Sequence, residues 1–142
     1  MEIINKSTQY ALKAIFSINN SEYANLSLRE ISTQISVPPT FLRKVLQKLG
    51  ASGIIEASSG PNGGYKIKKD LSKITLYEIH KIIQGELTLN RCFINDDFPN
   101  SFPKNKCPLL KKFSKIQTDL NDALKSLTLA EIAKLYKNHF SK

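Results

Sequence analysis

Two short helical patterns separated by a pair of prolines constrain this chain most strongly. Ser27 and Glu30 have the spacing of a capping box, in which each side chain satisfies the other residue's backbone N–H. Pro38 and Pro39 should stop this helix, because the residue before a proline avoids the helical region. Pro39 itself suits the first position of the next helix, and Gly53 should end that helix. The segment therefore predicts a helix-turn-helix.

A glycine-rich turn between two strand patterns follows the second helix. The strand patterns cover residues 54–57 and 65–68, and the turn between them reads Ser-Ser-Gly-Pro-Asn-Gly-Gly. This arrangement is typical of a hairpin. The predicted fold class is mainly α with a small β-hairpin wing: a winged helix-turn-helix domain followed by a long dimerisation helix.

The outward positions of the second helix carry cations and hydrogen-bonding groups but no carboxylate. Such a face suits phosphates and the base edges of the major groove, and the wing adds further lysines. A merely solvated face is the alternative for one helix alone, but the helix-turn-helix and wing together favour double-stranded DNA. The predicted DNA-binding residues are Ser27, Thr40, Phe41, Arg43, Lys44, Gln47, Lys48, Ser59, Asn62, Lys66 and Lys68.

Three of these residues have a more specific expectation. Lys66 is assigned to phosphate. Arg43 is assigned to a base, with a preference for guanine. Phe41 contacts a thymine methyl group or packs on the core, and the sequence leaves both readings open.

The charge of the chain supports a polyanionic partner. Lys and Arg number 21 against 12 Asp and Glu, which gives a formal net charge of +9. This balance favours a salt-sensitive interaction with phosphate, without separating DNA from RNA or an anionic membrane. The first residues lack the pattern of a signal peptide, and no apolar run approaches the ~20 residues that cross a bilayer. We expect a cytoplasmic protein without a membrane partner, and no motif indicates an enzyme.

The remaining chain predicts four further helices, an irregular segment and a tail. A first helix should start near Ser7 or Thr8, and a second capping box at Thr75 and Glu78 should open a helix that ends at Gly85. An irregular segment then covers about residues 90–106. A long helix should begin at Pro108. A third capping box should open a short last helix, and residues 134–142 should form a loosely held tail. The predicted domains are the DNA-binding domain at 1–86, a sensor-type loop at 87–107, and the dimerisation helix with the last helix at 108–142.

Heptad spacing predicts that the long helix is a dimer interface. In such a dimer, the two recognition helices would read a palindromic operator. The alternative is a helix that folds back on its own subunit. The predicted interface residues are Leu109, Phe113, Ile116, Leu120, Ala123 and Leu127.

Seven segments carry a resemblance to a known family, namely residues 9–14, 28–31, 41–46, 60–65, 74–79, 107–109 and 127–132. They resemble the IscR/NsrR/CymR family, the Rrf-two type of bacterial transcription regulator. The resemblance runs from about residue 5 to residue 134, in order and with close spacing. It implies a homodimeric DNA-binding repressor whose long helix is the dimer interface. It also implies a sensor, because many members bind an iron–sulfur cluster through three cysteines in the loop before that helix.

This chain departs from the cluster-binding members of the family. Cys92 and Cys107 match the first and last of the three cysteines, with no cysteine between them. Leu110 and Gln9 stand where members carry the fourth ligand. Two thiolates fall short of the four ligands that are usual for such a cluster, so a bound iron–sulfur cluster is disfavoured.

A thiol switch remains possible without a cluster. Cys107 should be the N-cap of the long helix, where the helix dipole and neighbouring lysines would favour a reactive thiolate. The alternative is a pair of inert cysteines. In that case control would come from a protein partner, such as a metabolic enzyme, or from a small ligand.

Overall fold

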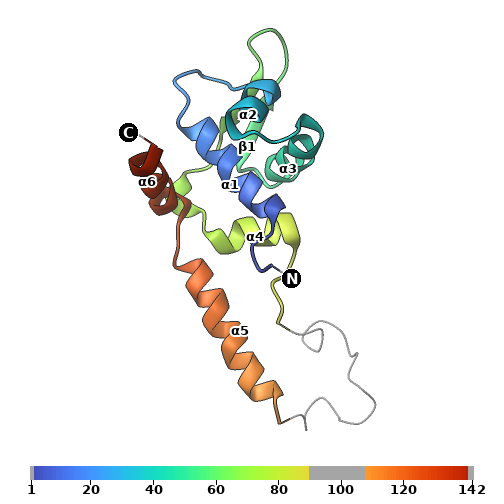
Figure 1. The fold of residues 1–142 in the computed structure, drawn as a ribbon, viewed down its shortest axis with the longest axis vertical. Coiled ribbons are helices and arrows are strands. Elements are labelled where there is room, and N and C mark those ends of the chain that lie inside the picture. Colours follow the sequence, from blue (N-terminus) through green and yellow to red (C-terminus); the bar gives the residue numbers. More distant parts are fainter. Residues whose placement is uncertain (1, 90–107, 141–142) are drawn as a thin grey trace.

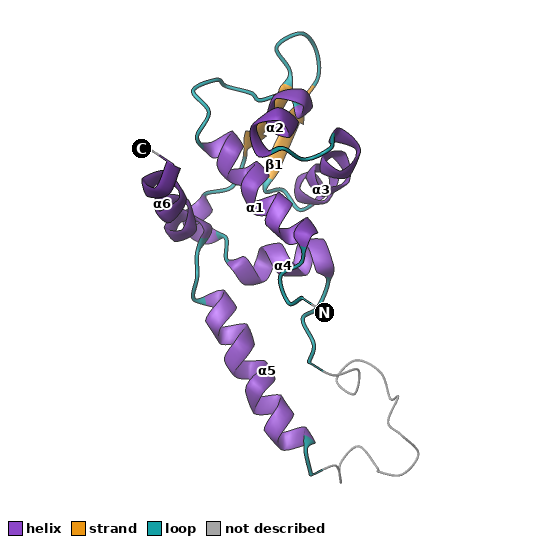
Figure 2. Ribbon diagram, viewed as in Figure 1, coloured by secondary structure: helices purple, strands orange, loops and turns teal. Residues whose placement is uncertain are grey.

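The computed structural model describes residues 2–89 and 108–140, with backbone only for 138–140. The elements are α1 (Lys6–Asn19), α2 (Leu28–Ile35), α3 (Pro39–Ala51), β1 (Ile55–Ser58), β2 (Gly64–Ile67), the 3-10 turn η1 (Leu71–Lys73), α4 (Leu76–Gln84), α5 (Leu110–Lys125) and α6 (Leu129–Phe140). Figure 1 shows α1 between the other helices of the main body, with the wing at one end and α5 extending from the other. Figure 2 shows helices throughout and one small hairpin. The predicted mainly α fold with a small β-hairpin wing is confirmed, and dimerisation through the long helix stays a prediction.

The hydrophobic core is built around α1. Ala11, Ala14 and Ile15 are fully buried, so close packing against the neighbouring helices covers α1 on several sides. The other helices contribute large apolar side chains to the same cluster, among them Ile31, Leu42, Leu46, Leu49, Ile79 and Leu129. The residues that should present the DNA-binding face therefore stand on a packed scaffold.

The turn between α2 and α3 forms as predicted. The Ser27 hydroxyl accepts from the Glu30 N–H at 3.1 Å, and the Glu30 carboxylate accepts from the Ser27 N–H at 2.8 Å. Ser36 ends α2 in the left-handed conformation, with φ 55° and ψ 47°. Pro39 is the first residue of α3. The order of α2 and α3 thus follows from local signals.

The starts of α1 and α4 lie close to their predicted positions, and the structure corrects two details. α1 begins at Lys6, before the predicted Ser7 or Thr8, because the Asn5 side chain accepts from the Thr8 N–H at 3.1 Å. At α4 the Thr75 hydroxyl accepts from the Glu78 N–H at 3.2 Å, but the Glu78 carboxylate lies 3.5 Å from Lys69 Nζ. The second capping box is therefore only half formed, because a lysine outside the helix attracts its carboxylate.

The predicted short last helix with a loose tail is also wrong. α6 continues to Phe140, well beyond residue 134. Its first residue, Leu129, is fully buried. The centroid of the Tyr136 ring lies 5.1 Å from the centroid of the Phe16 ring of α1. Packing on α1 thus extends the helix across the sequence that was expected to be loose.

Candidate DNA-binding surface and dimer face

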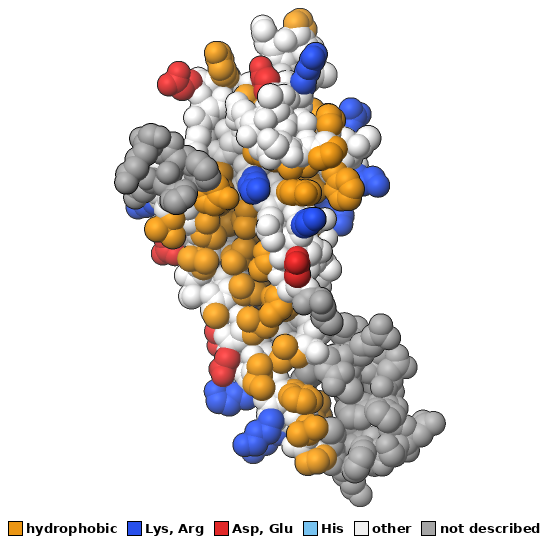
Figure 3. All heavy atoms as spheres, viewed as in Figure 1, with side chains coloured by type: hydrophobic (Ala, Val, Ile, Leu, Met, Phe, Trp, Pro, Cys, Tyr) orange, Lys and Arg blue, Asp and Glu red, His pale blue; other side chains and the backbone are white. Residues whose placement is uncertain are grey.

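One face of α3 is buried and the opposite face is exposed. Leu42, Val45, Leu46 and Leu49 belong to the core, while Thr40, Arg43, Lys44 and Gln47 are exposed. Figure 3 shows apolar side chains with lysine and arginine around them in the region of α3. Pro39 and Leu42 fix this orientation, since one starts the helix and the other is fully buried. The exposed side chains can hydrogen-bond to phosphates and base edges.

Lys48 differs from its neighbours on α3. Lys48 is exposed overall, but its ammonium group donates a hydrogen bond to the Ile83 carbonyl at 2.9 Å. Ile83 lies in the last turn of α4, where carbonyl groups lack helical partners. The sequence placed Lys48 among the outward DNA-binding side chains, and the structure instead directs its charge towards α4.

Phe41 lies in the first turn of α3 beside the polar side chains. Its N–H donates to the Pro38 carbonyl at 3.1 Å, and 53% of its surface is exposed. The ring meets the Tyr10 ring of α1 edge-on, with centroids 6.5 Å apart and an angle of 86°. Phe41 therefore packs on the domain and is exposed at the same time.

The wing is an antiparallel hairpin in which Glu56 pairs with Lys66 and Ser58 with Gly64. Lys66 Nζ lies 3.6 Å from the Glu56 carboxylate, an exposed pair that contributes little to stability. Ser59, Asn62, Lys66 and Lys68 are all exposed. The predicted strands at 54–57 and 65–68 are each displaced by one residue from the observed β1 and β2.

The wing is held against the residues that precede α2. Leu26 and Tyr65 exchange two backbone hydrogen bonds, of 3.0 and 2.8 Å. Gly64 has φ +145°, and a Cβ there would lie 2.6 Å from the Leu26 carbonyl oxygen. The Asn25 side chain adds a third link, since its amide donates to the Asn62 carbonyl at 3.0 Å. The sequence analysis missed Asn25, because no local pattern marks a residue whose partner is 37 positions away.

These links place Ser27 next to the wing. Ser27 follows Leu26 directly and is the N-cap of α2. Its hydroxyl oxygen accepts from Glu30, and the hydroxyl hydrogen is a donor that can reach a phosphate. The structure thus brings the start of α2, the exposed face of α3 and the wing to the same end of the domain (Figure 1).

α5 exposes an apolar face. No residue of this fully described helix is buried, and Leu109 and Ile116 are 54% and 52% exposed. Phe113, Leu120 and Leu127 are half-buried, and Ala123 is exposed. Figure 3 shows hydrophobic side chains along α5 that continue over α4 towards α6. Such a continuous apolar surface is typical of a protein interface.

A flank of α5 beside the apolar face is bound to its own chain. The Gln117 side chain donates to the Leu87 carbonyl and accepts from the Leu89 N–H, both at 2.7 Å. At the end of the helix, Lys125 Nζ lies 4.6 Å from the centre of the Tyr77 ring. These contacts fix the position of the helix, and the described residues leave Leu109, Ile116 and Ala123 exposed on its apolar face.

Cys92 and Cys107 lie outside the described residues. The predicted role of Cys107 as N-cap is wrong, because α5 begins at Leu110 and Leu109 is its N-cap. Pro108 and Leu109 form a turn before the helix, so the helix starts later than the proline suggested.

The donor set of the chain does not fit a four-thiolate cluster. The whole sequence holds two cysteines, Leu110 cannot coordinate, and the Gln9 amide donates to the Ile4 carbonyl at 3.3 Å. Within residues 2–89 and 108–137, no three His, Cys, Asp or Glu side chains gather as metal ligands would.

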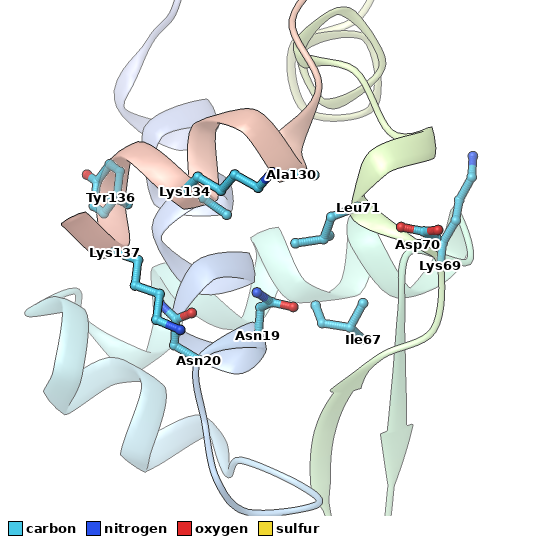
Figure 4. Close-up of a pocket in the computed structure, with 11 residues that line it drawn as sticks. Asn19, Asn20, Ile67, Lys69, Asp70, Leu71, Ala130, Lys134, Tyr136 and Lys137 are labelled. Carbon is cyan, nitrogen blue, oxygen red and sulfur yellow. The ribbon is translucent and has the colours of Figure 1, made fainter. Parts of the chain in front are cut away.

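A cavity of about 730 Å³ separates α6 from the base of the wing (Figure 4). Ile67 and Leu71 line it on the wing side, and Lys134 lines it from α6. Asp70 stands at its edge, where hydrogen bonds from Ser72 lower the pKa of the carboxyl group. This cavity lies on the α6 side of the wing, whereas α3 lies on the other side.

None of the helices in the described part of the chain has the length and apolar character to cross a bilayer.

The comparisons with known proteins agree with the arrangement of α2, α3 and the wing. The family model described as "Rrf2: Iron-dependent Transcriptional regulator" matches residues 4–135.

Individual relatives show the same likeness. A protein of Aquifex aeolicus, named as an HTH-type transcriptional regulator, is 23% identical over 96% of this chain and 95% of its own length. The HTH-type transcriptional regulator IscR of Escherichia coli is 28% identical over 59% of this chain and 52% of its own length. The structure of CymR, the global cysteine regulator of B. subtilis, is 19% identical with a TM-score of 0.74, covering 95% of this chain and 98% of that one.

Proposed function

This chain belongs to the Rrf2 family of transcriptional regulators and is a DNA-binding regulator rather than an enzyme, and we propose that it binds a palindromic operator as a homodimer. The exposed face of α3 enters the major groove, and the start of α2 and the wing contact the flanking backbone. The proposed effect on transcription is repression, because a dimer bound at the operator blocks the access of RNA polymerase to the DNA. A regulator of this kind works in the cytoplasm, where we expect this protein.

The single observation that carries this proposal is the composition of the α3 face. Thr40, Arg43, Lys44 and Gln47 are exposed together on a helix whose other face is part of the core. Arg43 can donate two hydrogen bonds to guanine, and Lys44 can neutralise a phosphate. The wing provides contacts to the DNA backbone through Lys66, Lys68, Ser59 and Asn62. The formal charge of +9 is in line with such contacts.

The test is a comparison of three variants on a site selected from random duplex DNA. Arg43→Ala should weaken binding to the selected site by about 1–3 kcal/mol and relax base choice at one position of each half-site. Lys66→Ala should weaken binding to all sequences about equally, and Lys112→Ala on α5 should change neither. Unchanged sequence preference in Arg43→Ala would contradict the assigned role of α3.

The homodimer is supported by the apolar face of α5, which the described residues cover only in part. Leu109, Phe113 and Ile116 follow heptad spacing on a helix with no buried residue, as expected when a second copy covers them. The alternative, a helix that folds back on its own subunit, would bury these residues.

Two routes for the regulatory signal give different results with peroxide. Regulation through Cys92 and Cys107 predicts that peroxide changes DNA affinity in the wild type but not in Cys107→Ser. If all samples bind equally, control by a protein partner, such as a metabolic enzyme, or by a small ligand is favoured. An absorption spectrum of protein purified without oxygen would reveal an iron–sulfur cluster, which the donor set disfavours.

A further inference from the structure

Phe41 is an exposed apolar ring beside the polar side chains of α3. It lies in the first turn of α3, next to Thr40 and two positions before Arg43, and 53% of its surface is exposed. Single exposed hydrophobic side chains are common and need no explanation by themselves. Phe41 differs because its ring is held by a second aromatic residue from another helix.

Tyr10 supports the Phe41 ring from α1. The two rings meet edge-to-face, with 6.5 Å between centroids and an angle of 86°, a favourable aromatic geometry. Tyr10 is half-buried and is followed by the fully buried Ala11, so its backbone position is fixed by the core. The contact restrains the Phe41 side chain before DNA arrives, which lowers the entropy cost of using it in binding.

The chemistry of the major groove limits what this ring can meet. Base edges there present donors and acceptors, except for the C5-methyl group of thymine, which is apolar. We propose that Phe41 contacts a thymine methyl group in each half-site, and that Tyr10 is the positioning residue that holds its ring. This inference rests on the proposed binding by α3 and adds the identity of one base.

The expected size of the effect follows from the size of one methyl group. Burial of one CH₂-sized group contributes about 0.8 kcal/mol, which corresponds to about fourfold in the dissociation constant. A dimer that makes the contact in both half-sites should lose roughly fifteenfold when both methyl groups are removed, because separate sites add.

The test replaces each thymine of a selected duplex by deoxyuridine, which removes only the C5-methyl group. Wild type should lose about fourfold at one thymine of each half-site. Phe41→Ala should bind the thymine and uracil duplexes equally. Phe41→Leu, which keeps an apolar side chain, should retain part of the preference.

Tyr10 is tested by the same readout. Tyr10→Phe keeps the ring and should retain the methyl preference, whereas Tyr10→Ala should lose most of it. A purely structural role of Tyr10 would lower affinity for both duplexes and leave their ratio unchanged.

Several results would overturn the proposal. They are a selected site without thymine, a wild type that tolerates uracil at every position, and a methyl preference that persists in Phe41→Ala. Failure to select any site would instead refute the proposed function, so the two failures are distinguishable. The uracil comparison with wild type needs no variant and is independent of any folding defect.

Discussion

Asn25 connects the segment before α2 to the turn of the wing, because its side-chain amide donates a hydrogen bond to the Asn62 carbonyl at 3.0 Å. The backbone pair of Leu26 and Tyr65 lies beside this bond. The wing is therefore attached to the segment before α2 both through strand β2 and through its turn.

Asn25→Ala should release the tip of the wing without unfolding the domain. A net hydrogen bond contributes about 0.5–1.5 kcal/mol, so a small fall in thermal stability is expected. The larger effects should be faster proteolysis in residues 58–64 and weaker binding to all DNA sequences. Asn20→Ala, at the exposed end of α1, is the control. Equal protease resistance in both variants would show that Asn25 does not restrain the wing.

Three glycines should respond differently to replacement by alanine. A Cβ at Gly64 would lie 2.6 Å from the Leu26 carbonyl, at φ +145°, so Gly64→Ala should lose several kcal/mol of stability. Gly60 has φ +99° with open space around it, so Gly60→Ala should cost about 1–2 kcal/mol. Gly50 lies inside α3 with open space, and Gly50→Ala should gain up to about 1 kcal/mol. Thermal unfolding gives the order, and a Gly64→Ala as stable as Gly60→Ala would contradict the close contact.

Lys44 and Lys48 form a matched pair one helical turn apart on α3. Lys44→Ala should lower the slope of log affinity against log salt by about 1, as expected for one lost phosphate contact. Lys48→Ala should leave that slope nearly unchanged and reduce stability instead, because Lys48 bonds to the Ile83 carbonyl. Filter binding at several salt concentrations measures the slopes. Equal losses of slope would return Lys48 to the DNA-binding set.

Charges in the apolar face of α5 should separate the proposed dimer. Replacing both Ile116 and Leu120 by Glu should give a monomer that no longer binds a palindromic site, because two copies would bring four carboxylates together. Lys111→Glu with Thr118→Glu places the same residues on the exposed opposite side and should remain dimeric. Light scattering gives the mass of each variant. A dimer in the first variant would refute the interface.

Short-range signals made most of the DNA-binding domain predictable. Ser27, Glu30 and Pro39 act within a few residues, so the start of α2 and the start of α3 could be read from the sequence. The buried side of α3 followed from its spacing of leucines and valine. The predicted start of α5 at Pro108 was wrong, because Pro108 and Leu109 form a turn before the helix.

Long-range contacts account for the features that the sequence did not reveal. The Glu78 carboxylate pairs with Lys69 rather than with the backbone N–H of Thr75. The Lys48 ammonium bonds to the Ile83 carbonyl of α4 rather than pointing into solvent. α6 extends because Tyr136 packs on Phe16, a contact across most of the chain. In each case the local pattern allowed two states, and a distant partner selected one.

The junction between α5 and α6 is joined to the DNA-binding domain by backbone bonds. The Leu76 N–H donates to the Leu127 carbonyl, and the Leu129 N–H donates to the Ile74 carbonyl, both at 2.9 Å. In the proposed dimer, each DNA-binding domain is thus joined directly to the α5 helix that forms the interface, without a flexible linker. One inserted base pair rotates one half-site by about 35° relative to the other. Following that rotation would strain these bonds, so the proposed dimer should discriminate against operators whose half-site spacing is changed.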